Sequence, residues 1–80
     1  MEQKRKMKTL FGKRMKELRL EKGLTQKQLA GELQITVSTV SRYERGLSER
    51  STKLLIKCAE YFQVSTDYLF GRTDVRKSKK

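Results

Sequence analysis

Apolar residues recur at helical spacing in the first third of the chain. Phe11, Met15 and Leu18 lie at positions i, i+4 and i+7 and form one stripe. This spacing is typical of a helix that buries one face, and it does not fit the alternation of a strand. Gly23 follows the stripe, and glycine readily takes the left-handed conformation with which many helices end. The sequence therefore predicts a first helix that ends at Gly23.

A second, shorter helix is predicted from Gln26 to Leu33. Thr25 and Gln28 have the spacing of a capping box, in which the hydroxyl accepts a bond from a free backbone N–H and the amide reaches back to the cap. Leu29 and Leu33 are four residues apart and line one face of this segment.

A third helix is predicted to begin near Thr36, whose hydroxyl is a second candidate cap. Val40 and Tyr43 fall at i+4 and i+7 from it and face the core, and Gly46 ends the helix. Only residues 34–35 separate the second and third helices. Two short helices with so short a connection form an angular hairpin whose second helix can project from the body.

Two more helices complete the pattern. One is expected over about 52–62, with Ser51 as its cap, and a short one follows Ser65 and ends before Gly71. Beyond Gly71 we expect disorder. The residues predicted to form one core are Phe11, Met15, Leu18, Leu29, Leu33, Ile35, Val40, Tyr43, Leu55, Cys58, Ala59 and Phe62.

Length and composition agree with an all-α fold of five helices. Eighty residues make one domain with one modest core, and the chain has no proline and few β-branched residues. We expect a basic N-terminal extension over 1–8, a folded domain over 9–71 and a basic, disordered tail over 72–80.

Several kinds of chemistry are excluded by the residue types present. Cys58 is the only cysteine and there is no histidine, so neither an internal disulfide nor a zinc site is expected. Without histidine or clustered acidic residues there is no evident catalytic base, nucleophile or cofactor site, so we expect no enzyme. The apolar runs are too short for a membrane span or a signal peptide. A cytoplasmic location is therefore predicted.

The net charge of +11 indicates a polyanionic partner, although most of the excess lies at the ends of the chain. Residues 1–22 carry nine basic and three acidic side chains (+6), residues 23–70 six and five (+1), and residues 71–80 five and one (+4). The two ends are equally interpretable as nucleic-acid arms or as solubilising segments.

Three sequence blocks carry a resemblance to a known family. They are residues 23–30 (GLTQKQLA), 40–46 (VSRYERG) and 64–71 (VSTDYLFG). At this spacing the chain resembles the phage Cro and repressor family of helix-turn-helix proteins, of the xenobiotic-response-element type, over about 11–71. The chain departs from the family at Gln34, where the turn often has glycine, and near Arg50, where the family often has proline. Gln34 is therefore expected to adopt a positive φ.

Geometry and resemblance together assign site residues. The exposed start of the third helix and the residue one turn on would contact base edges: Thr36, Val37, Ser38 and Arg42. Arg42 could instead neutralise a phosphate. The expected phosphate contacts are Gln26, Arg45, Ser48, Arg50 and Lys53. The resemblance also implies a structural ion pair between Arg19 and Glu44.

The resemblance implies a transcriptional regulator, most simply a repressor, that reads a palindromic double-stranded DNA operator through the major groove. A homodimer is expected because one recognition helix reads few base pairs, and Tyr61 and Tyr68 are candidates for its interface. One alternative is an antitoxin or a larger switch, with a toxin or antirepressor as protein partner. A membrane-surface or RNA-binding peptide driven by the basic ends is the other alternative.

Overall fold

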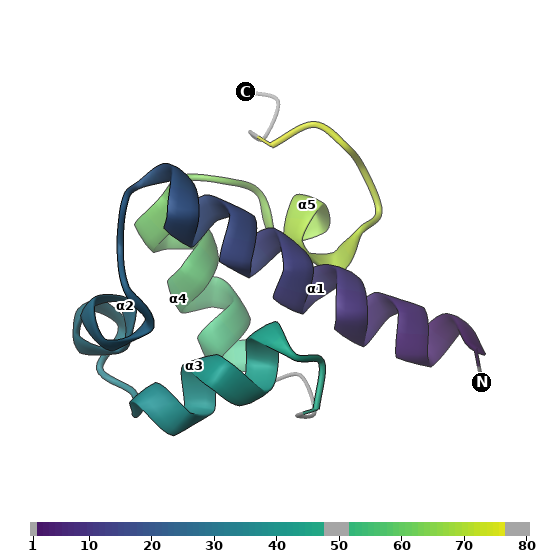
Figure 1. Ribbon diagram of the computed structural model, residues 1–80. Coiled ribbons are helices and arrows are strands. Elements are labelled where there is room, and N and C mark those ends of the chain that lie inside the picture. Colours follow the sequence, from purple (N-terminus) through teal and green to yellow (C-terminus); the bar gives the residue numbers. More distant parts are fainter. Residues whose placement is uncertain (1, 48–51, 77–80) are drawn as a thin grey trace.

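The structure, a computed structural model, describes residues 2–47 and 52–76, with side chains from residue 10 onward. Within these residues the chain forms five α-helices and no strand (Figure 1). They are α1 (Glu2–Glu21), α2 (Gln26–Leu33), α3 (Val37–Glu44), α4 (Thr52–Phe62) and α5 (Thr66–Phe70). The predicted all-α fold is confirmed.

Local hydrogen bonds explain where three of the helices begin. Thr25 Oγ1 accepts from Gln28 N at 3.0 Å, and Gln28 Oε1 accepts from Thr25 N at 2.9 Å, so the predicted capping box is present at α2. Thr36 caps α3 and Ser65 caps α5 in the same way, through their hydroxyl oxygens. Ser51, the expected cap of α4, lies outside the described residues.

α1 is longer than its apolar stripe. It begins at Glu2, so the backbone of residues 2–8, expected as a basic extension with no assigned element, continues the helix. This segment is rich in lysine, arginine and methionine, which favour helices, and contains no glycine or proline. α1 ends at Glu21, and Gly23 has a φ of 71°, as its predicted role as a stop requires.

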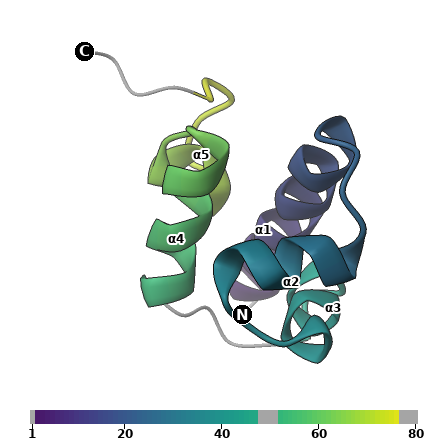
Figure 2. The same cartoon turned by 90° about the vertical axis from the view of Figure 1, so that its left-hand side faces the viewer.

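The helices enclose one core between two groups. α3 packs against both α1 and α2, whereas α5 packs against α1 and α4, and α4 also contacts α2. Figure 2 shows α4 and α5 together on one side of the molecule and α1, α2 and α3 on the other. This arrangement leaves the side of α3 that faces away from α1 and α2 at the surface.

The core is nearly the predicted one. Every predicted core residue is buried except Ile35, which is partly buried and packs against the others. Ala30, Leu54, Tyr68 and Leu69 are buried as well. The burial of Tyr68 corrects its assignment to a dimer surface: its ring packs under the guanidinium of Arg14, at 4.2 Å from the ring centroid to Arg14 Cζ.

The chain beyond α5 follows a defined path up to Arg76, where disorder was expected. We call residues 72–76 the strap. Asp74 pairs with Arg14 of α1 at 2.8 Å, and Arg76 pairs with Glu21 at the end of α1 at 2.6 Å. The backbone of Arg76 also accepts a bond from the N–H of Ser65. These partners on α1 and before α5 explain the order, since composition gave no sign of them; residues 77–80 lie outside the described residues.

Candidate nucleic-acid interface

The first turn of α3 presents short side chains to solvent. Thr36 and Ser38 are exposed, and the side chain of Val37 is 43% exposed. The Thr36 hydroxyl oxygen accepts from Thr39 N at 3.1 Å and lies 2.8 Å from Thr39 Oγ1. Because its hydroxyl caps the helix, Thr36 has less hydrogen-bonding capacity left for a ligand than Ser38.

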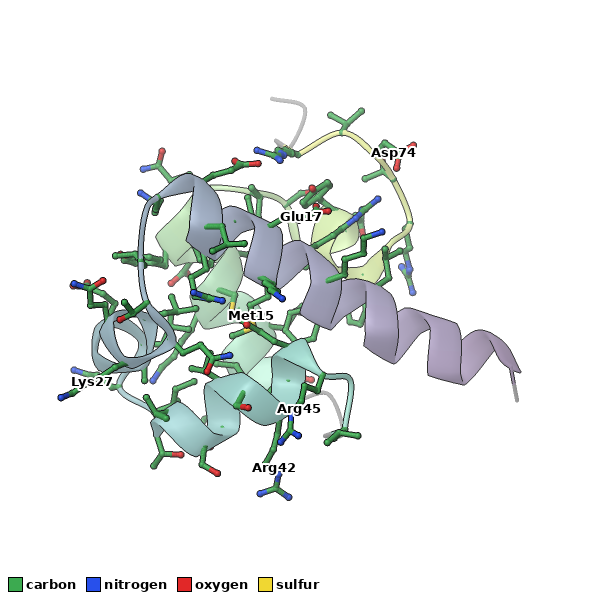
Figure 3. All side chains as sticks on the ribbon, viewed as in Figure 1. Met15, Glu17, Lys27, Arg42, Arg45 and Asp74 are labelled. Carbon is green, nitrogen blue, oxygen red and sulfur yellow. The ribbon has the colours of Figure 1, made fainter. Side chains whose placement is uncertain are left out.

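α3 is two-sided. Val40 and Tyr43 are buried against the body, while Arg42 is exposed and lies one turn beyond Ser38. Figure 3 shows Arg42 and Arg45 projecting from α3 away from the other helices. The exposed side of α3 therefore combines hydroxyl, methyl and guanidinium groups, which can bind the acceptors and methyl groups of base edges and the oxygens of phosphates.

The turn before α3 fixes the direction in which that helix projects. Gln34 has a φ of 59° and a ψ of 45°, the left-handed conformation predicted for it. Its N–H and that of Ile35 bond back to carbonyls of α2, at Gly31 and Ala30. Lys57 of α4 donates to the Leu33 carbonyl at 3.1 Å, so α4 also holds the end of α2.

The far end of α3 is tied to α1 and α2 by a buried carboxylate. Glu44 accepts from Arg19 Nε at 2.7 Å and from Arg19 Nη2 at 3.1 Å, and only 9% and 3% of the Arg19 and Glu44 side chains are exposed. Arg19 Nη1 also donates to the Leu24 carbonyl at 2.8 Å. This arrangement satisfies a buried charge with fork-like hydrogen bonds and fixes α3 on the body.

Gln26 takes part in the same cluster, a contact that the sequence did not reveal. Its Nε2 donates to Glu44 Oε1 at 3.0 Å. The side chain assigned to a phosphate is thus held in place by α3, and one N–H of its amide remains for a second acceptor. The first residue of α2 and the last residue of α3 therefore have a fixed relative position.

The other assigned phosphate-binding residues are less constrained. Arg45 and Lys53 are exposed, at the end of α3 and in the first turn of α4. Ser48 and Arg50 lie outside the described residues. Lys27, which sequence reasoning passed over, is also exposed, in the first turn of α2 (Figure 3). A basic side chain next to a helix start was the signal that could have identified it.

Other site chemistries find little support in the described part of the chain. No group of three or more acidic, cysteine or histidine side chains there could hold a metal ion. Cys58 is buried, and this burial raises the pKa of its thiol to about 12. Among residues 2–47 and 52–76, no helix has both the length and the apolar character needed to cross a membrane.

Residues 15–69 match the sequence model of the family described as helix-turn-helix. The chain belongs to this family, in its phage Cro and repressor subgroup of the xenobiotic-response-element type. It is 43% identical over 67 residues to the HTH-type transcriptional regulator ImmR of Bacillus subtilis, an alignment that covers 84% of this chain and 53% of ImmR. The chain spans about half the length of the curated relatives it matches.

Two solved structures share the fold. The restriction-modification controller protein C.AhdI of Aeromonas hydrophila has a TM-score of 0.69 and 34% identity, over 76% of this chain and 92% of C.AhdI. The P22 c2 repressor, solved in complex with a synthetic operator, has a TM-score of 0.70 and 27% identity, over 75% of this chain and 91% of the repressor. These proteins and ImmR are named as regulators, and none of the three is named as an enzyme.

Proposed function

We propose that this chain is a sequence-specific double-stranded DNA-binding regulator of transcription, most simply a repressor, and that α3 reads the major groove. The two-sided character of α3 carries the proposal. One side is buried and locked to the body through Glu44, and the other presents Val37, Ser38 and Arg42 to solvent. A short helix held at both ends and exposed along one side has the shape that enters a major groove.

The assigned contacts divide into reading and holding. Val37 methyls suit the thymine methyl group, and the Arg42 guanidinium suits the paired acceptors of guanine, so these residues would distinguish base pairs. Gln26, Arg45 and Lys53 would bind phosphates, and Lys27 joins them because it is exposed beside Gln26. Ser48 and Arg50 stay assigned to phosphates on the sequence argument alone.

We propose that the chain binds as a two-fold homodimer on an approximate palindrome, in the cytoplasm. A single short recognition helix contacts only a few base pairs, so a second copy one DNA turn away adds both affinity and specificity. A bacterial or phage operator would be the target, and occupancy of the promoter region would be the regulatory event.

Selection of bound duplexes from a random pool tests this function directly. The full chain should enrich an approximate palindrome with half-site centres about 10 base pairs apart. A polyanion competitor such as heparin should remove non-specific binding but leave the enriched sequence bound. A pool that stays random after repeated rounds would contradict sequence-specific binding, and enrichment of direct repeats would contradict the two-fold dimer.

A further inference from the structure

The side of α1 that faces the strap carries a binding arrangement that DNA recognition does not use. Arg14 Nη1 donates to the carbonyl of Thr73 at 2.7 Å and also to that of Tyr68, while Nη2 donates to Asp74 Oδ1 at 2.8 Å. One guanidinium thus binds a backbone carbonyl and the next carboxylate of an extended segment. Figure 3 shows Asp74 on the opposite side of α1 from Arg42 and Arg45.

The Arg14 half of this contact is preformed by the fold. The Arg14 side chain is only 12% exposed, it lies over the buried ring of Tyr68, and it bonds to the carbonyl of that residue. Contacts to α5 therefore hold the guanidinium in position whether or not the strap is bound. A planar guanidinium fixed in this way presents a fork of donors that suits a carboxylate.

The strap half of the contact is exposed. The side chain of Asp74 is 98% exposed, and the second fastening point, Arg76 with Glu21, is 43% and 51% exposed. Exposed ion pairs contribute little to stability and are screened by salt. The strap is therefore an occupant that another segment of the same chemistry can replace.

We propose that Arg14, seated on Tyr68, is a docking site for an extended acidic segment of a partner protein, and that Thr73 and Asp74 occupy it in cis. The ligand is a stretch of extended backbone whose carbonyl is followed by an aspartate side chain. The family match covers residues 15–69, so Arg14, Thr73 and Asp74 all lie outside it. The site is thus a feature of this chain beyond the shared helix-turn-helix.

A second copy of this chain is a less suitable occupant than a different protein. Two copies that exchanged straps would meet through the strap side of α1, and Figures 1 and 2 place α3 on the other side of that helix. Their recognition helices would point away from each other and could not reach one duplex together. A separate acidic partner has no such conflict, because it binds on the side opposite the exposed face of α3.

The test is a titration of the full ¹⁵N-labelled chain with the peptide acetyl-Arg-Thr-Asp-Val-Arg-amide, which copies the strap, followed by NMR. The receptors are wild type, Asp74→Asn, which weakens the cis occupant, and Asp74→Asn with Arg14→Lys or Arg14→Gln, which remove the fork. Asp67→Asn is the matched control, because Asp67 is an exposed acid whose contact to Arg72 is 3.9 Å long. Thermal unfolding of each variant shows that it is folded.

We expect Asp74→Asn to bind the peptide about two- to fivefold more tightly than wild type, the range that loss of an exposed ion pair allows. Asp67→Asn should match wild type. Both Arg14 variants should lose binding, and a peptide with asparagine for aspartate should bind more weakly.

Three results would overturn the proposal: no saturable shifts in Asp74→Asn, equal binding by the folded Arg14 variants, or a wild-type dimer by light scattering that Asp74→Asn abolishes. The last result would show strap exchange between copies. Because the titration contains no DNA, its failure leaves the proposed DNA binding untouched.

Discussion

Gly12 of α1 lies directly against the carbonyl oxygen of Tyr43 in α3: a Cβ at Gly12 would be 2.0 Å from that oxygen and 3.0 Å from the carbonyl oxygen of Glu44. The two helices therefore touch backbone to backbone at the C-terminal half of α3. Glycine is required here by the close approach, because any larger residue would push α3 away from α1.

Gly12→Ala should therefore destabilise the protein by about 3 kcal/mol, at the upper end of what overpacking costs. Gly31→Ala is the control, since Gly31 lies in α2 with nothing within 4 Å of its Cβ position. It should stabilise by about 0.5 to 1 kcal/mol through helix propensity. Urea unfolding followed by circular dichroism measures both. Equal effects of the two substitutions would show that α1 and α3 are not packed this closely.

The Arg19 to Glu44 pair should behave as a buried ion pair. Glu44→Ala leaves Arg19 and the Gln26 amide without their acceptor, so it should cost about 3 to 5 kcal/mol of unfolding free energy. Replacing both partners with Arg19→Met and Glu44→Leu should cost less than Glu44→Ala alone, because no unpaired charge remains. If the double variant loses as much as the single one, packing rather than charge pairing dominates at this site.

Gln34 holds a conformation that glycine adopts without strain. With φ at 59° and no side-chain contact required by the turn, Gln34→Gly should stabilise the protein by about 0.5 to 1 kcal/mol, despite the greater freedom of glycine in the unfolded chain. Gln34→Val should destabilise it, since a β-branched residue is disfavoured at positive φ. Thermal unfolding measures both changes. A lower melting temperature for Gln34→Gly would mean that the amide side chain stabilises the turn.

Cys58 should be unreactive in the folded protein. Its side chain is fully buried, and burial raises the pKa of the thiol from 9.0 to about 12. A bulky thiol reagent at pH 8 should react at least about a thousandfold more slowly than with the urea-unfolded chain, because reaction needs unfolding. The stability supplied by the neutral thiol is present below pH 9.0 and is lost as the pH rises toward 12. Modification at the unfolded rate would contradict the core assignment.

Local hydrogen bonds made much of the fold predictable. The caps at Thr25, Thr36 and Ser65 each bond to a residue three positions on, so the sequence shows both partners within one turn. The positive φ of Gln34 followed from the two-residue turn in the same way. Helical spacing identified the core because burial recurs with the turn of the helix.

Contacts between distant segments were not predictable in this way. Gly12 resembles a weak point of a helix, and only the packing of α3 shows that it is required. The Gln26 to Glu44 bond joins residues 18 positions apart, and Arg14 to Asp74 joins residues 60 apart, with no periodicity to indicate either. The basic charge of the chain after Gly71 suggested a mobile tail, whereas the strap depends on partners in α1.

The central claim is that α3 reads base pairs through Arg42 while residues such as Lys53 only hold the backbone. The most direct measurement compares Arg42→Ala with Lys53→Ala on one selected operator and its single-base variants, across a range of salt concentrations. Arg42→Ala should cost about 1 to 3 kcal/mol on the best site and remove the preference at one base pair per half-site. Lys53→Ala should weaken all sites equally and lower the salt slope by about one per contact. If Arg42→Ala instead weakens every site equally and keeps all base preferences, Arg42 binds only phosphate, and the claim is contradicted.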